Sequence, residues 1–182
     1  MTPWQQMQEY LESAAAAFGW RSGLAYRGPA DFVLHHGRDY EVAPWPRGFW
    51  RGAPLSCYGN AILVSAATDL PYVEGYAVPP EGPRPLHHAW NVLPDGRALD
   101  TTWLNSGLVY CGAPFSLGRA DHATWTLDAT VLDDPLHAWP LLAEHWEGEP
   151  PGLTWPESLA LALARLVCRG DGRFTLRPDS TP

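Results

Sequence analysis

The chain has 182 residues, of which 46% are hydrophobic and 18% charged, a composition typical of a globular protein and not of a disordered one. Its net charge of −8 argues against nucleic acid and anionic membranes as partners, because both attract Lys and Arg. Three scattered cysteines form neither a disulfide framework nor a zinc ribbon. We find no signal peptide and no apolar run of the roughly 20 residues that span a membrane. We therefore expect a cytoplasmic protein in which residues 1–182 form a single domain.

The N-terminal segment, residues 3–18, is predicted to be a helix. Its apolar residues recur at helical spacing, and Gly19 is typical of a helix end. Residues 20–55 are interrupted by many glycines and prolines, so we expect irregular structure there. The only regular element expected within it is a short strand at 31–34.

A second helix is predicted over residues 57–68, with Ser56 as its N-cap. Cys57 would then occupy the first turn of this helix. Unpaired backbone N–H groups and the helix dipole favour negative charge there, so the position favours a thiolate. The alternative is an inert cysteine that packs like a small apolar residue, which is the commoner role of a free cysteine.

Three strands are predicted in the middle of the chain, at residues 72–78, 86–93 and 97–103. The last two flank residues 94–96, Pro-Asp-Gly, which is typical of a three-residue hairpin loop. Side chains alternate between the faces of a strand, so this loop length puts Asp100 opposite Trp90 and on the face of His88. A two-residue loop at 95–96 would put Asp100 on the other face.

Asp100 would be a diagonal neighbour of His88 in this register. Such neighbours lie roughly 7–8 Å apart, within reach of a carboxylate and an imidazole. The carboxylate would fix the tautomer of His88 and stabilise its charged form, whereas His87 would face the other way. If the helix start at Cys57 meets His88, the two form a nucleophile that attacks an acyl carbon. The Cys57 N–H is a natural oxyanion donor, and the candidates for a second donor or a pocket wall are Trp50, Tyr58, Asn60 and Trp90.

Two patterns in the sequence suggest a metal site, and each has a simpler explanation. Cys57, His88 and Asp100 could bind zinc, but a zinc site needs a fourth position, and a carboxylate that orients a histidine explains the pattern without metal. His35 and His36 are adjacent, and adjacent residues on a strand face opposite ways, so they rarely ligate one ion. We therefore predict neither a metal nor a cofactor.

Further elements are predicted after the hairpin: strands at 108–111 and 124–129, and helices at about 134–140 and 154–169. Pro140 would kink or shorten the first of these helices, and Thr154 with Glu157 forms a capping box for the second. Residues 171–182 are polar and are expected to be loosely ordered. The predicted fold class is α+β, with an antiparallel sheet packed against the cysteine-bearing helix and additional N- and C-terminal helices.

The order of these residues resembles the transglutaminase-like branch of the papain-like thiol enzymes. The match covers about residues 50–105 and consists of Cys57, of His88 with Ala89-Trp90, and of Asp100 with Thr101-Thr102-Trp103. The resemblance implies a core in which a cysteine-bearing helix packs on an antiparallel sheet, with the His and the Asp on adjacent strands. Gly59-Asn60 stands where animal transglutaminases have an aromatic residue and small residues, so protein cross-linking as such is not implied.

The expected function is that of a thiol enzyme that attacks an amide or acyl bond through a Cys-His-Asp triad and a thioester. A peptidase, amidase or deamidase is the first interpretation, with a protein, a peptide or a small amide as substrate. One alternative is an acyltransferase or cross-linking enzyme with the same triad. The other is a non-catalytic interaction module that retains the fold, with its Trp- and Pro-rich loops as the binding surface.

Overall fold

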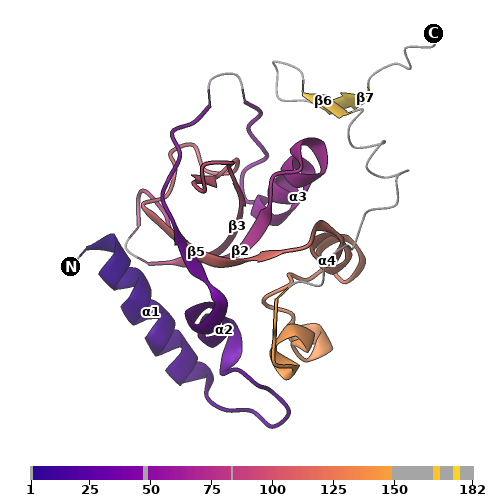
Figure 1. Cartoon of the computed structure of the whole chain (residues 1–182). Helices are drawn as coiled ribbons and strands as arrows, with labels where there is room; N and C mark the ends of the chain where they lie inside the picture. Colours follow the sequence, from indigo (N-terminus) through magenta and orange to yellow (C-terminus); the bar gives the residue numbers. More distant parts are fainter. Residues whose placement is uncertain (1, 47–48, 83, 149–165, 169–173, 177–182) are drawn as a thin grey trace.

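A five-stranded antiparallel sheet forms the centre of the molecule, and four α-helices pack on it (Figure 1). This computed structural model describes residues 2–46, 49–82 and 84–148, together with the backbone of 166–168 and 174–176. The strand order is β1-β5-β2-β3-β4, with β1 (Arg38–Tyr40), β2 (Tyr72–Val78), β3 (Leu86–Val92), β4 (Ala98–Leu99) and β5 (Val109–Phe115). The helices are α1 (Pro3–Phe18), α2 (Gly28–His36), α3 (Cys57–Thr68) and α4 (Leu117–Asp121). The predicted α+β class is confirmed.

The first predicted helix and the cysteine-bearing helix both form over the predicted residues. The α1 helix begins with a capping box, in which the Thr2 hydroxyl accepts from the Gln5 N–H, and it ends at Gly19 with φ at 69°. The α3 helix spans residues 57–68. Ser56 is the N-cap residue of α3, as predicted, but its side chain accepts no bond from the helix, and its hydroxyl instead donates to the Pro54 carbonyl.

The second helix, α2 (Gly28–His36), corrects the prediction of a strand at 31–34. Pro29 occupies the first turn, where its fixed φ suits a helix. The Asp31 carboxylate accepts a bond of 2.8 Å from the Arg27 N–H and a second bond from the Arg27 guanidinium. A carboxylate in the first turn thus satisfies the helix start, in a segment whose glycines and prolines suggested irregular structure.

The hairpin between β3 and β4 has the predicted register. Asn91 pairs with Leu99 and Val92 with Ala98, as a three-residue loop requires, and Gly96 has a φ of 87° in that loop. The second strand of the hairpin is shorter than predicted, because β4 ends at Leu99 and not near residue 103.

Asp100 itself ends β4. Its carboxylate accepts hydrogen bonds from the backbone N–H groups of Thr102 at 2.8 Å and Trp103 at 3.3 Å. A side chain that bonds the backbone two and three residues ahead turns the chain, so the strand cannot continue. Asp100 is therefore at a bend beside β3 and not within a strand.

The predicted strand at 124–129 is also wrong. The chain is helical from Leu117 to Asp121, as α4, and continues as a π-helical turn over His122–Thr126. The Ser116 hydroxyl accepts from the Arg119 N–H at the start of α4. Buried alanines at 120 and 123, spaced as on a helix, fix this segment against the core.

Two short 3-10 helices, Pro135–His137 and Pro140–Ala143, replace the helix predicted at about 134–140. Most of the helix predicted at 154–169 lies outside the described residues. Its last part is a strand, β6 (Leu166–Cys168), which pairs antiparallel with β7 (Phe174–Leu176). The tail predicted to be loosely ordered at 171–182 therefore contains a strand.

The two faces of the sheet bury separate clusters of side chains. One face packs against the helices and includes Met7, Leu11, Phe32, Ile62, Tyr72, Ala89, Ala113 and Phe115. The other face lies inside the curl of the sheet and includes Tyr40, Val73, Ala77, Trp90, Val92, Ala98 and Tyr110. His88 pairs with Gly75 of β2 and so lies on this inner face, whereas His87 lies on the helix face.

The curl is closed by the chain that follows β1. Val42 forms a parallel bridge with Ala98 of β4. The Ala43 N–H donates to the Ala98 carbonyl at 2.9 Å, and the Ala98 N–H donates to the Glu41 carbonyl at 2.7 Å. The segment that follows β1, at one edge of the sheet, thus bonds to β4, at the other edge. Among the described residues, no helix combines the length and the apolar character needed to cross a bilayer.

Candidate active site

Cys57, His88 and Asp100 come together where β4 has ended and the edge of β3 is open. The α3 helix lies along β3 on the helix face, held by the Asn91 amide, which donates to the Ala61 carbonyl at 2.9 Å and to the Ser65 hydroxyl at 2.8 Å. The first residue of α3 is Cys57, whose side chain interacts with the imidazole of His88 through a hydrogen bond and through its charge. The sequence predicted this encounter.

The imidazole of His88 lies between Asp100 and Cys57. Nε2 donates to the Asp100 Oδ2 at 2.8 Å, which leaves Nδ1 for the thiol of Cys57. Burial lowers the pKa of His88, but the hydrogen bonds and charges of Asp100 and Cys57 outweigh it and raise this pKa to about 9. At neutral pH, His88 is therefore a cation beside the Cys57 side chain.

Asp100 is held by more groups than the sequence indicated. The Tyr110 hydroxyl donates to Oδ2 at 2.8 Å and in turn accepts from the Gly107 N–H at 2.7 Å. Together with the backbone donors of Thr102 and Trp103 and with His88, this gives the buried carboxylate four hydrogen bonds. Burial raises the pKa of Asp100, but these partners lower it below its ordinary value. Asp100 is thus an anion of fixed orientation.

Asn60 has a structural role in place of the predicted oxyanion role. Its amide Nδ2 donates to the Ala53 carbonyl at 2.8 Å and to the Thr102 hydroxyl at 2.9 Å, and its Oδ1 accepts from the Ala53 N–H. Both amide hydrogens are occupied, so none is left for a substrate oxygen. Asn60 instead ties the segment before Cys57 to the segment after Asp100, which sets the distance between these two groups.

The other predicted oxyanion or pocket residues lie in different environments. Trp90 is fully buried in the inner cluster, so it cannot line a site, and that prediction is wrong. Trp50 is partly buried in the segment before α3. Tyr58 is partly buried, and burial together with the charge of Cys57 raises the pKa of Tyr58 far above its ordinary value. Its phenol therefore keeps its proton, and its ring packs near that of His87, with centroids 5.7 Å apart.

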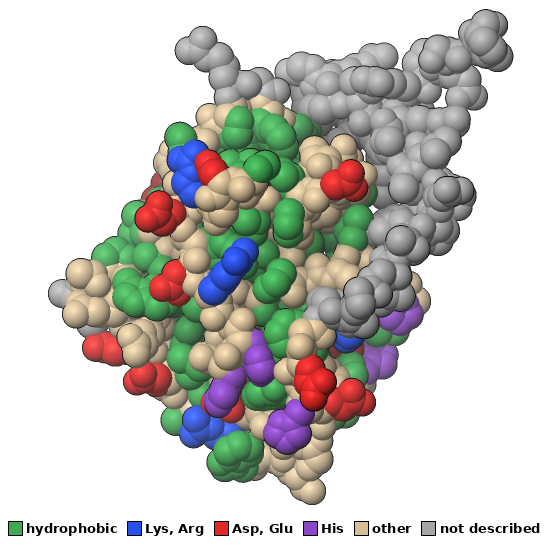
Figure 2. Space-filling view, in the orientation of Figure 1, with side chains coloured by type: hydrophobic (Ala, Val, Ile, Leu, Met, Phe, Trp, Pro, Cys, Tyr) green, Lys and Arg blue, Asp and Glu red, His purple; other side chains and the backbone are tan. Residues whose placement is uncertain are grey.

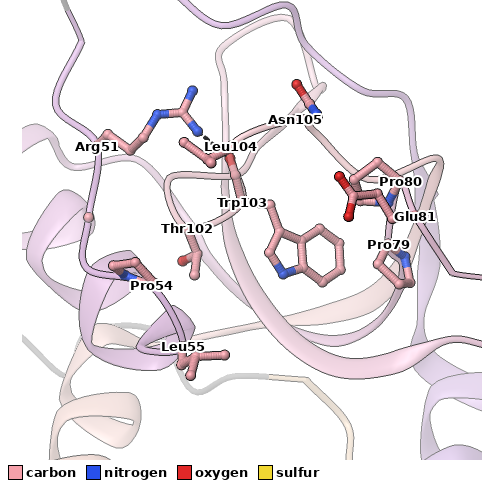
Figure 3. A pocket seen from close by; sticks show the side chains of 11 residues that line it. Arg51, Pro54, Leu55, Pro79, Pro80, Glu81, Thr102, Trp103, Leu104 and Asn105 are labelled. Atoms are coloured by element: carbon pink, nitrogen blue, oxygen red, sulfur yellow. Dashed lines mark hydrogen bonds between the residues drawn. The ribbon is translucent and has the colours of Figure 1, made fainter.

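Trp103 connects the triad to a cavity. Its indole stacks on the imidazole of His88, with ring centroids 4.1 Å apart and planes within 16°. The same residue lines a cavity of about 420 Å³ whose other walls come from the segment before α3, the loop after β2 and the residues after Trp103 (Figure 3). Arg51 lies at one side of this cavity, and its guanidinium donates to the Trp103 carbonyl. The sequence offered no spacing signal for Arg51 or Tyr110, because both contacts depend on the folded chain.

On the helix face, directly behind the triad, lie His87 and Glu74. Glu74 is fully buried and accepts from the Tyr72 hydroxyl at 2.6 Å and from the N–H groups of Val131 and Leu132 at 3.0 and 2.9 Å. It therefore faces the core and not His88. Burial lowers the pKa of His87 to about 4, so this ring is neutral.

The remaining histidines and Cys111 lie away from the triad. Histidine side chains gather near the lower end of the face in Figure 2. His35 and His36 are in the last turn of α2 and not on a strand; the Tyr26 hydroxyl is 2.6 Å from the His36 Nε2. Within the described part of the chain, no group of three or more His, Cys, Asp or Glu side chains is arranged to hold a metal ion. Cys111 is buried in β5, where burial and the charge of Asp39 raise its pKa to about 12.

Comparison with known proteins identifies no relative of this chain. No family model, no curated protein and no solved structure matches the chain. Any assignment of function therefore depends on the arrangement of the side chains described above.

Proposed function

We propose that the protein is a thiol enzyme that attacks an amide or acyl carbonyl through Cys57, His88 and Asp100. The observation that carries the proposal is a single chain of contacts, in which a cysteine at a helix start meets an imidazole whose other nitrogen is 2.8 Å from a buried carboxylate. These contacts supply a nucleophile, a proton carrier and an orienting group.

The proposed reaction has two stages. The Cys57 sulfur adds to the carbonyl carbon as a thiolate, and His88 as a cation donates its proton to the leaving amine when the C–N bond breaks. A thioester remains on Cys57. Neutral His88 then takes a proton from water, the hydroxide attacks the thioester, and the acid leaves as the thiol re-forms. The Cys57 N–H is the proposed donor to the oxyanion.

The proposed enzyme class is a peptidase, amidase or deamidase with a transglutaminase-like core. The order of a cysteine on a helix, a histidine on a strand and an aspartate after a tight hairpin supports the resemblance. Transfer to an amine would follow the same first stage. The chain contains no lysine, so an amine-incorporation assay has no background from its own lysine side chains.

We also propose the cytoplasm as the compartment, since the mechanism requires a reduced thiol. Cys57 and Cys111 are both free in the described part of the chain.

The test is the rate of alkylation by iodoacetamide at pH 6.5–7, read at each cysteine by peptide mass spectrometry. Cys57 should react at least about tenfold faster than Cys111, whose pKa is raised to about 12, and faster than Cys168. The variant His88→Ala should slow the reaction at Cys57 by about tenfold or more. The exposed His122, changed to Ala, is the matched control and should leave the rate unchanged. Equal rates at the three cysteines would refute the proposal and favour a non-catalytic module.

A further inference from the structure

The cavity beside Trp103 is built from segments that adjoin each member of the triad. Pro54 and Leu55 immediately precede the helix of Cys57, and residues 102–105 follow Asp100. The third wall, residues 79–81, belongs to the loop that leads from β2 into the strand of His88. A group bound in this cavity therefore touches Trp103, which stacks on His88 at 4.1 Å. The cavity thus adjoins the proposed site through Trp103.

The walls of this cavity present apolar side chains to solvent. Leu55 is 100% exposed and Leu104 is 81% exposed, and both line the cavity. Pro79 and Pro80 form the opposite wall (Figure 3). Exposed leucines beside a concave surface are typical of a binding site for an apolar group, since they lose contact with water only when the ligand is present.

Leu55 is also held in an uncommon backbone conformation. Its φ is 62°, in the left-handed region that residues other than glycine seldom adopt. Two residues later the chain enters α3 at Cys57. The turn leaves the Leu55 side chain exposed at the border of the cavity, as Figure 3 shows, rather than buried in the core.

The charges at the cavity do not favour a charged ligand. Arg51 lies at one side, donates to the Trp103 carbonyl and lies over the Trp45 ring, with 4.1 Å to the ring centroid. Glu81 lies on the other side. These two opposite charges give the cavity lining no net charge, so its apolar side chains are expected to determine which ligand binds.

We propose that this cavity binds a bulky apolar side chain of the acyl donor. The substrates are then peptides or small amides that carry a leucine-like or phenylalanine-like group beside the bond under attack. A volume of about 420 Å³ holds such a side chain together with the neighbouring peptide group. The inference rests on the proposed thiol chemistry, but binding in the cavity is testable without it.

The first test measures binding to the Cys57→Ala protein, in which no reaction at Cys57 occurs. The probes are N-acetyl-leucinamide, N-acetyl-phenylalaninamide and N-acetylglycinamide, titrated with saturation-transfer NMR. The two apolar probes should bind at least about fivefold more tightly than the glycine probe. The double variant Leu55→Asn with Leu104→Asn, added to Cys57→Ala, should remove this preference; Asn tolerates the left-handed φ at position 55.

The matched control is Leu136→Asn, which removes another leucine that is 77% exposed but lies outside the cavity. It should leave the preference unchanged. All of these leucines are exposed, and circular dichroism establishes that each variant is folded. Equal binding of the three probes, or a preference that survives the double variant, overturns the inference whether or not Cys57 is a nucleophile.

The second test places the cavity next to the reacting thiol. N-acetyl-phenylalanine and N-acetylglycine chloromethyl ketones alkylate a cysteine with loss of chloride, and their rates at Cys57 are divided by the rate with iodoacetamide. The phenylalanine reagent should react at least about tenfold faster, and the double variant should remove most of this advantage. If Cys57 outpaces Cys111 with iodoacetamide but the two ketones react alike, the inference is wrong and the proposed function stands. A preference for apolar probes in the first test with no enhanced reactivity at Cys57 would instead refute the proposed function alone.

Discussion

At the scale of single residues, His88 is positioned from three directions. Asp100 accepts from Nε2, Cys57 interacts with the ring, and the indole of Trp103 covers one face of it. Two of these neighbours stabilise the cation electrostatically, and stacking on an aromatic ring also favours a cation. This arrangement explains why a histidine as buried as His88 has a raised pKa and His87 a lowered one.

Replacing Asp100 with Asn should lower the pKa of His88 from about 9, because the hydrogen bond keeps its shape but loses its charge. The raised pKa stabilises the fold below the ordinary histidine pKa of roughly 6.5, and this contribution is lost as the pH rises through about 9. Between pH 6 and pH 9.5, Asp100→Asn should therefore lose less stability than the wild-type protein loses. NMR titration of the imidazole and urea unfolding at pH 6 and 9.5 provide the measurements.

The matched control for this variant is Asp95→Asn, an exposed carboxylate in the hairpin loop that bonds Arg97. It should leave the pKa of His88 in place. A value for His88 that stays near 9 in Asp100→Asn would mean that the carboxylate does not set the charge of the ring.

The pairing of His88 with Asp100 was predictable because local chemistry determined it. Pro-Asp-Gly at 94–96 fixed the loop length, the loop length fixed the register, and the register put Asp100 and His88 on one side of the hairpin. The roles of Tyr110 and Asn60 were not predictable in this way. Tyr110 reaches Asp100 from β5 across the inner face of the sheet, and Asn60 bonds a residue 42 positions later, so only tertiary packing reveals them.

At the scale of elements, a pair of glycines lets the central strands approach. Gly75 of β2 lies opposite Gly112 of β5. A Cβ on Gly75 would lie 2.1 Å from the Cys111 carbonyl oxygen, and a Cβ on Gly112 would lie 2.7 Å from the Trp90 ring. The inner face thus accommodates the Trp90 indole because Gly112 lacks a side chain, and β2 approaches β5 closely because Gly75 also lacks one.

The variant Gly75→Ala should lower the free energy of unfolding by about 2–3 kcal/mol, because the methyl group forces β2 and β5 apart. Urea denaturation monitored by tryptophan fluorescence measures the change. Gly59→Ala is the comparison, since the added Cβ meets the end of the Trp125 ring at 3.3 Å within a helix that favours alanine. Gly59→Ala should leave stability nearly unchanged, and an equal loss in both variants would contradict the close approach of the strands.

Helices and strands were predicted well where the apolar periodicity of a segment stopped at a residue that is typical of turns or helix ends. The helices at 3–18 and 57–68 and the strand at 72–78 form over the expected residues. The prediction failed at α2 (Gly28–His36), where prolines and glycines hid a helix that Asp31 caps from within. It also failed at β4, which the side chain of Asp100 ends early.

At the scale of the whole molecule, Glu74 joins the centre of the sheet to a segment far along the chain. Its carboxylate accepts from the backbone of Val131 and Leu132, 57 and 58 residues later, and from the Tyr72 hydroxyl. Buried donors must be satisfied, so one side chain secures this distant segment against the sheet.

Glu74→Ala should therefore lower the free energy of unfolding by at least about 3 kcal/mol, since three buried donors lose their acceptor. Denaturant unfolding measures the loss, and Glu144→Ala, at an exposed glutamate, should change stability by no more than about 0.5 kcal/mol. Stability equal to that of wild type in Glu74→Ala would show that the 131–132 segment does not depend on this carboxylate.

The bridge from Val42 to Ala98 has a consequence for behaviour in a crowded solution. A sheet that ends in unpaired strands offers its backbone donors and acceptors to other chains, and such borders seed aggregation. Here the residues after β1 bond to β4, so the border at β4 is occupied by the same chain. The bonds that close the curl around Trp90 thereby also limit strand-to-strand association between copies of the protein.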